Sequence, residues 1–268
     1  MKFTKSLSIT SGKGGVGKST LAANIAQDFS LQGKKVLLFD GDVGMGNLHV
    51  IFGVHAEKNI IDVIKGHCSI DEAVTRVLPG VDLIPGGSGL IEVNGINSFE
   101  RRNLLDAMDE LARRYDYLIV DTAPGIAEHV LFLNAAVDQT IVVITSDPSS
   151  FADAYALIKV LNLYHKVKKF SIVCNYTRDE AEGKLLFKRF SDVTHRFLNV
   201  GLDYLGSIAF ETGLRRAGLH RRLIMREDAN NSAAQSLREI SAQIIDERLE
   251  ISQSKGLQLN WAQVVGLA

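Results

Sequence analysis

The sequence predicts an α/β fold with a predominantly parallel, twisted sheet and helices on both of its faces. Short, continuously apolar runs of strand length alternate along the chain with longer stretches in which apolar residues recur at helical spacing. A glycine-rich loop joins the first of these runs to the first helical stretch. With 268 residues, the chain is long enough to bury the core of one large domain of this class.

Each predicted element follows from a local pattern. The run Leu7–Thr10 is short and rich in strand-forming residues, and apolar side chains then recur at helical spacing from Leu21 to Phe29, after which Gly33 ends the helix. Further strands are predicted at 36–39, 81–84, 117–120, 140–144 and 170–174, and further helices near 98–114, 149–164, 179–199 and 232–250. We expect residues 1–250 to form one domain and residues 251–268 a tail with a short amphipathic helix.

Composition narrows the class of protein. The formal net charge of −1 gives no general attraction to nucleic acid or to an acidic membrane. The two cysteines, Cys68 and Cys174, lack the spacing of metal ligands and suit a reducing compartment. Since no apolar run is long enough to span a bilayer and no signal peptide is recognisable, we expect a cytoplasmic protein.

Residues 12–20 read G-K-G-G-V-G-K-S-T and match the phosphate-binding pattern G-x-x-x-x-G-K-[ST] through Gly12, Gly17, Lys18 and Ser19. In such a loop the backbone N–H groups surround the phosphates at a helix N-terminus, the lysine reaches the terminal phosphates and the hydroxyl binds Mg²⁺. Lys13 is not required by the general pattern. The sequence therefore predicts a nucleotide and Mg²⁺ here, and the remaining loop positions expected to contact the nucleotide are Gly14, Gly15, Val16 and Thr20.

Three carboxylates follow predicted strands, where the ligands of a parallel sheet bind. Asp40 and Asp42 come at the end of the second strand, and Asp121 follows the apolar residues 118–120. Carboxylates at these places hold Mg²⁺ and orient an attacking water, although a carboxylate at a strand end also caps turns and Asp121 has the position of a helix N-cap. The small residues 122–125 behind Asp121 have the character of a segment that moves with the terminal phosphate.

Together with Asn47, these motifs resemble the deviant-Walker ATPases of the MinD/ParA family, and the resemblance covers nearly the whole chain. It implies the SIMIBI-type P-loop NTPase fold and a Mg²⁺-dependent ATPase with weak basal activity. It also implies an ATP-dependent homodimer, in which Lys13 of each subunit reaches the ATP of the other. In the family pattern Asp42 activates the water, whereas Asp40 supports Mg²⁺.

Two further residues are assigned to the nucleotide by this resemblance. Asn175 matches the family's adenine-contacting asparagine, although an asparagine at a strand end is also a common turn residue. Glu211 ends the stretch 206–211, which stands where the family has G-x-I-P-x-D. The proline of that motif is missing and its acid is glutamate.

One subgroup of the family is closer than the others. Residues 40–48 are similar to the D-x-D-x-G-x-x-N-L stretch of MinD-like proteins and lack the D-P-Q-G-N of ParA proteins. Residues 149–159 are similar to the T-S-x-x-D-A-Y-A-L-I-K stretch of FlhG proteins, also called FleN or YlxH. This similarity implies a regulator of flagellar number and placement whose partners are flagellar regulators or basal-body components. Plain packing of this helix on the sheet is the alternative explanation.

Two surface features complete the prediction. In the tail, Leu257 and Trp261 share a helical face with Val264 and Val265, which favours reversible contact with the inner membrane or docking on protein. A basic cluster follows residue 214 and is typical of a solvated helix end, although acidic lipid or a DNA backbone would also fit it. Its members are Arg215, Arg216, His220, Arg221 and Arg222.

Two rival functions remain open at this stage, and the intact Asp42 disfavours a third, a binding module with an inactive ATPase site. A ParA-type partition ATPase would use DNA as its matrix, and the net charge disfavours it. An iron–sulfur reductase or carrier would need cysteines at a dimer axis, whereas Cys68 is predicted in a loop–helix region and Cys174 within a strand.

Overall fold

A computed structural model describes residues 4–42, 46–87, 110–111 and 113–251. Within them the fold is a single sheet of eight strands with the order β3-β4-β2-β5-β1-β6-β7-β8. All neighbouring pairs are parallel except β3 and β4, so the predicted fold class is confirmed. The strands are β1 (Lys5–Thr10), β2 (Val36–Gly41), β3 (Thr75–Leu78), β4 (Val81–Ile84), β5 (Tyr117–Thr122), β6 (Gln139–Ile144), β7 (Lys169–Thr177) and β8 (Gly201–Ala209).

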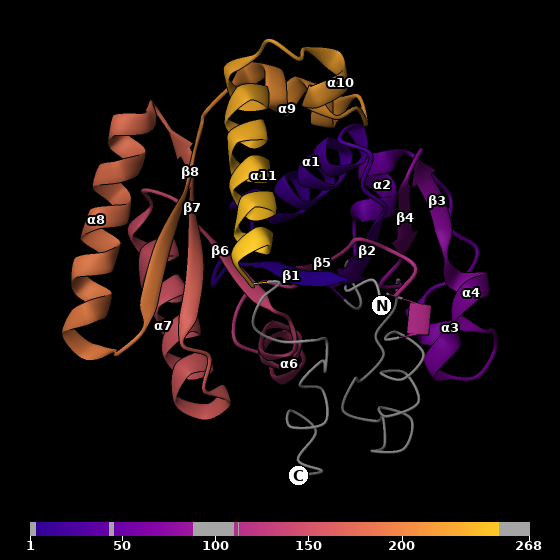
Figure 1. Ribbon diagram of the computed structural model, residues 1–268, viewed down its shortest axis with the longest axis horizontal. Helices are drawn as coiled ribbons and strands as arrows, with labels where there is room; N and C mark the ends of the chain where they lie inside the picture. Colours follow the sequence, from indigo (N-terminus) through magenta and orange to yellow (C-terminus); the bar gives the residue numbers. More distant parts are fainter. Residues whose placement is uncertain (1–3, 43–45, 88–109, 112, 252–268) are drawn as a thin grey trace.

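Helices cover both faces of the sheet, with α1 and α11 on one face and α6 and α7 on the other (Figure 1). The predicted helices at 149–164, 179–199 and 232–250 are present as α7, α8 and α11, whereas most of the one near 98–114 lies outside the described residues. The described helices are α1 (Lys18–Leu31), α2 (Leu48–Phe52), α3 (Ile60–Ile64), α4 (Ile70–Ala73), α6 (Glu128–Ala136), α7 (Pro148–His165), α8 (Glu180–Phe197), α9 (Thr212–Leu219), α10 (Ile224–Glu227) and α11 (Ser232–Ile251).

The continuous apolar runs are explained by burial on both faces. Successive side chains of a strand point to opposite faces of the sheet. In β2, Val36 and Leu38 pack into the core beneath α1, and Leu37 and Phe39 pack into the core on the opposite face. Every residue of β1, β2, β5 and β6 is buried, and these four central strands hold the loop and the carboxylates of the site.

The edges of the sheet were harder to predict. The chain adds β3 antiparallel to β4 at one edge and β8 beside β7 at the other. In β8 most positions are only partly buried, and the stretch 201–209 contains glycine and aspartate, so no continuous apolar run indicated a strand. The predicted boundary between a domain at 1–250 and a tail at 251–268 remains a prediction, because residues 252–268 lie outside the described residues.

Candidate nucleotide-binding site

The glycine-rich loop connects β1 to α1, and its backbone approaches neighbouring segments too closely for a side chain at two positions. Gly17 caps the N-terminus of α1 with φ 96°, and a Cβ there would overlap the side-chain amide of Asn175. A Cβ at Gly12 would overlap the backbone carbonyl of Asp153, in the second turn of α7. The loop therefore lies between β7 and α7, with the N-terminus of α1 facing the space that it encloses.

Lys18 is buried at the start of α1, with 7% of its surface exposed. Its Nζ donates to Ser11 Oγ at 3.0 Å, and Ser11 Oγ donates to the carbonyl oxygen of Lys13 at 2.6 Å. Burial lowers the pKa of Lys18, and the nearby Asp121 and Asp42 oppose this shift. The lysine is therefore held beneath the loop, in a position to contact a phosphate bound there.

Asp40 and Asp121 lie side by side because β2 and β5 are parallel neighbours in which these two residues are direct register partners. Asp40 accepts hydrogen bonds from the backbone N–H of Leu48 at 3.1 Å and of Asp42 at 3.3 Å. Asp121 accepts a hydrogen bond from the Ser19 hydroxyl, while its Oδ1 is buried and has no partner in the part of the chain that the structure describes. Strand register thus brings together the hydroxyl and carboxylates that the sequence assigned to the metal.

The two buried carboxylates are electrostatically costly in the absence of a cation. Burial raises the pKa of Asp121 to about 7, and the nearby charge of Asp40 contributes to the increase. Burial also raises the pKa of Asp40 to about 6, against the hydrogen bonds from the backbone. A divalent cation would offset the repulsion and satisfy the unpartnered Oδ1 of Asp121.

The donor set suits Mg²⁺ better than a metal enclosed by protein alone. The described residues contain no group of three or more histidine, cysteine or acidic side chains arranged to hold a metal ion. Mg²⁺ is commonly bound by one or two carboxylates together with phosphate oxygens and water. Ser19 and Asp121, with Asp40 beside them, fit that mode of binding.

A cleft of about 560 Å³ opens beside Gly17 and Thr20 and has the position expected for a nucleotide base. Asn175 and Glu211 both line it, as do Tyr176 and Phe210. The rings of Tyr176 and Phe210 meet edge to face with centroids 5.9 Å apart, and aromatic rings in this position provide apolar surface for a base. Sequence reasoning missed both aromatic residues, although each is adjacent to a residue that it selected.

The structure gives Asn175 and Glu211 contacts that the sequence did not predict. The Nδ2 of Asn175 donates to the carbonyl oxygen of Val16 at 2.7 Å, and its Oδ1 accepts from the backbone N–H of Tyr176 at 2.9 Å. Glu211 precedes α9 and accepts a hydrogen bond from the Ser232 hydroxyl. Asn175 thus holds the phosphate-binding loop against β7, and its contact with adenine stays a prediction.

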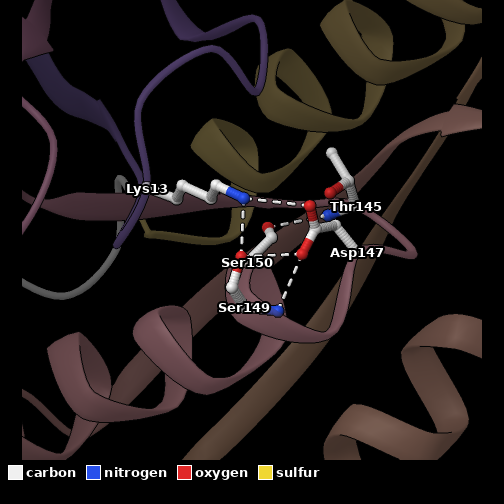
Figure 2. Close-up of polar contacts among 5 residues, drawn as sticks. All are labelled: Lys13, Thr145, Asp147, Ser149 and Ser150. Carbon is white, nitrogen blue, oxygen red and sulfur yellow. Dashed lines mark hydrogen bonds and ion pairs between the residues drawn. The ribbon is translucent and has the colours of Figure 1, made fainter.

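Lys13 points away from the enclosed space of the loop and contacts the first turn of α7 (Figure 2). Its Nζ lies 2.9 Å from Asp147 Oδ2 and donates to Ser149 Oγ at 2.6 Å. Hydrogen bonds from Ser149 and Lys13 hold the pKa of Asp147 well below its usual range. The side chains of Lys13 and Asp147 are 40% and 49% exposed, so this ion pair lies at the surface.

The contacts of Lys13 show where residues 149–159 lie relative to the phosphate-binding loop. Ser149 bonds the extra lysine, and the Asp153 backbone packs on Gly12, so the N-terminal part of α7 adjoins the start of the loop. Packing on the sheet, the alternative explanation for this string, accounts for its buried residues only. Asp147 was missed by sequence reasoning, although an aspartate directly before Pro148 is a typical helix N-cap signal.

A phosphate-binding loop between a parallel strand and a helix, with paired carboxylates on the neighbouring strands, defines a P-loop nucleotide-binding protein. The model of the AAA domain family matches residues 4–176. The chain is 31% identical to the antiactivator FleN of Pseudomonas aeruginosa over 89% of this chain and 85% of FleN. It is 37% identical to the flagellum site-determining protein YlxH of Helicobacter pylori over 90% of this chain and 82% of YlxH.

A solved structure of the septum site-determining protein MinD from Pyrococcus horikoshii, complexed with Mg-ADP, has the same fold. Its TM-score is 0.74 at 22% identity, covering 94% of this chain and 99% of that one. The chain belongs to the MinD/ParA-type family of P-loop ATPases. The family resemblance seen in the sequence, including its FleN/YlxH branch, is therefore confirmed.

Proposed function

We propose that this chain is an ATP-hydrolysing dimerisation switch that regulates the number and placement of flagella. The observation that carries the proposal is its similarity to FleN and YlxH over more than four fifths of each chain. Residues 149–159 support the same branch of the family, and in the structure they adjoin the phosphate-binding loop.

For the chemistry, we assign each residue around the loop one task. Lys18 neutralises the terminal phosphates of ATP, Ser19 and Asp121 hold Mg²⁺ with Asp40 in support, and Asp42 orients and activates the attacking water. Mg²⁺, when bound, screens the phosphate charge that grows as the terminal phosphate leaves. The backbone N–H groups of the loop bind the phosphates, and Tyr176 with Phe210 flanks the base.

Lys13 provides the dimerisation switch in this proposal. In the single chain its ammonium is occupied by Asp147 and Ser149. An exposed ion pair of this kind contributes little to stability, so Lys13 is able to leave it at little cost. In the dimer Lys13 reaches the ATP of the partner subunit, which makes each site complete only when two chains meet and keeps the basal activity of one chain low.

The pH dependence of nucleotide binding tests the assignment of the carboxylates. Mg-ADP is expected to raise the melting temperature more at about pH 8 than at about pH 5.5. In the nucleotide-free protein the pKa of Asp40 and of Asp121 is raised, so the folded state binds more protons than the unfolded state. Its free energy of unfolding then falls as the pH rises from about 4 to about 7, and a bound cation reverses this loss by favouring the ionised carboxylates.

Thermal unfolding with and without Mg-ADP at both pH values measures this difference. The substitution Asp121→Asn removes one of the two titrating groups and should make the increases in melting temperature at the two pH values more alike. Equal shifts at both pH values in the unsubstituted protein would contradict the assignment.

We propose a cytoplasmic location with reversible contact at the inner membrane. The predicted membrane-binding tail lies outside the described residues. Among the helices that the structure describes, none is long and apolar enough to cross a bilayer. Co-sedimentation with liposomes, with and without residues 251–268, separates membrane contact from docking on protein.

The rival functions receive less support. Cys68 lies between α3 and α4, next to the β3–β4 edge, whereas Cys174 is buried in β7 beyond the centre of the sheet, where burial raises its pKa to about 12. The two thiols do not share a site, which disfavours an iron–sulfur reductase. Salt-sensitive DNA binding by the ATP-bound dimer would favour a ParA-type partition ATPase instead.

Deletion of the gene in its native host, followed by counting of flagella per cell, tests the proposed function. The deletion should change flagellar number or position, and the wild-type gene should restore it. Asp42→Ala should fail to restore it, whereas Asp192→Ala, a matched change on the exposed side of α8, should succeed. An unchanged flagellar pattern in the deletion strain would refute the flagellar assignment and leave the family membership intact.

A further inference from the structure

A second cleft, of about 540 Å³, shares Ile51 of α2 with the nucleotide-base cleft. Its apolar wall includes Phe52 of α2 and Val77 and Leu78 of β3. Its opposite side is the segment that runs from Arg221 into α10. None of the residues assigned to the nucleotide or the metal lines this cleft, which we call the α2–α10 cleft.

The α2–α10 cleft carries positive charge that the described part of the protein does not neutralise. Arg222 is paired with Glu227 at 2.6 Å. Arg221 and Arg226 also line the cleft, are exposed, and have no ion pair with any described residue. Arg221 also borders a small adjoining hollow that is lined by His49 and His55.

A buried amide adds an observation that is independent of charge. Gln27 of α1 lines the α2–α10 cleft and is only 6% exposed. Its Oε1 is buried and has no hydrogen-bond partner among the described residues. Such a group is unfavourable when it is left unsatisfied, and an occupant that offers an N–H group would satisfy it once the Gln27 side chain turns toward the cleft.

We propose that the α2–α10 cleft binds an acidic segment of a protein partner. An apolar side chain of the segment packs against Phe52 and Leu78, its carboxylates pair with Arg221 and Arg226, and a main-chain N–H donates to Gln27. Duplex DNA supplies negative charge but no side chain to fill an apolar recess of this size. The combination of an apolar wall, guanidinium groups with no ion pair to any described residue and a buried amide therefore fits a peptide better than a nucleic-acid backbone.

The location of the cleft connects it to the ATP site. Ile51 of α2 lines both clefts, and α2 begins at Leu48, whose N–H donates to Asp40. On the other wall, the backbone N–H of Ile224 donates to Asn24 Oδ1 of α1 at 3.1 Å. An occupant therefore contacts the two helices that carry the phosphate loop and the Asp40 segment, and its effect on turnover rests on the proposed ATPase function.

Selection from a displayed library of short random peptides on the nucleotide-free full chain tests the binding directly. Recovered peptides should be rich in aspartate and glutamate and should contain an apolar residue. The double substitution Arg221→Glu and Arg226→Glu should weaken their binding by at least tenfold, about 1.4 kcal/mol. The matched control is Lys188→Glu with Arg189→Glu, which makes the same charge change on the exposed side of α8 and should leave binding unchanged.

Gln27→Leu provides a second variant that does not depend on charge. It should weaken peptide binding while leaving the melting temperature unchanged or higher, because it removes a buried unsatisfied group. Equal weakening by the α8 control, recovery of basic peptides, or binding of duplex DNA with the same dependence on Arg221 and Arg226 would overturn the proposal. Because these measurements use no nucleotide, their failure would leave the proposed ATPase function untouched.

Discussion

Replacing Lys13 by alanine is expected to abolish ATP-dependent dimerisation while leaving ATP binding to the single chain largely intact. Lys13 lies on the outer side of the phosphate loop, where its Nζ contacts Asp147 and Ser149. Lys18 carries the charge beneath the loop and remains in place in this variant. We therefore expect at least a hundredfold loss in dimer formation, because a charge-assisted contact with a shared phosphate is removed from both sites at once.

Size-exclusion chromatography with light scattering in Mg-ATP measures this effect. Both chains should also carry Asp42→Ala, which slows hydrolysis of ATP. The dimer formed by the chain that retains Lys13 should then be detectable. Asp147→Ala serves as a control on α7, since it frees Lys13 instead of removing it and should permit dimerisation at least as well as wild type. Equal dimer fractions with and without Lys13 would refute the role proposed for this residue, as would a chain that stays monomeric in the Asp42→Ala background.

Gly12→Ala is expected to lower the free energy of unfolding by about 3 kcal/mol or more and to abolish nucleotide binding. The added Cβ would overlap the backbone carbonyl of Asp153. A backbone group within a helix cannot rotate aside as a long side chain can, so either the loop or α7 has to move. Movement of the loop would displace the N–H groups that bind phosphate.

Gly14→Ala is the matched control within the same loop. A Cβ at Gly14 would make only an ordinary contact, 3.8 Å from Pro124 Cγ. Chemical denaturation measures the free energy of unfolding of both variants. It therefore shows whether the close approach of α7 causes the loss of stability or whether alanine is unfavourable anywhere in the loop. If Gly14→Ala lowers the free energy of unfolding as much as Gly12→Ala does, the contact with Asp153 is not the cause.

The central strands could be predicted from the sequence because burial on both faces of the sheet requires continuous apolar runs. The run 117–120 lies within β5, and the predicted helix 149–164 is α7 to within one residue at each end. The short helices α3 and α4 escaped prediction because each has at most five residues, although each begins with a capping box, at Asn59 and Ser69. Elements this short depend on tertiary contacts more than on periodicity.

The site was predictable where a rule of parallel sheets applies and was missed where distant segments meet. Asp40 and Asp121 were expected to converge because both follow parallel strands, and the register pairs them directly. The contact of Lys13 with Asp147 depends on how α7 lies against the loop, which no local pattern encodes. The pair of Tyr176 and Phe210 likewise depends on the alignment of β7 with β8.

The close contact between Gly12 and Asp153 couples the position of α7 to that of the phosphate-binding loop. Its 18 residues form a rod about 27 Å long, with one end against the phosphate loop and the other at His165. Close-packed atoms resist compression, so α7 and the loop cannot shift independently at this contact. A protein that tilted α7 would therefore move the Asp153 backbone against Gly12 and strain the phosphate-binding loop, without approaching the nucleotide itself.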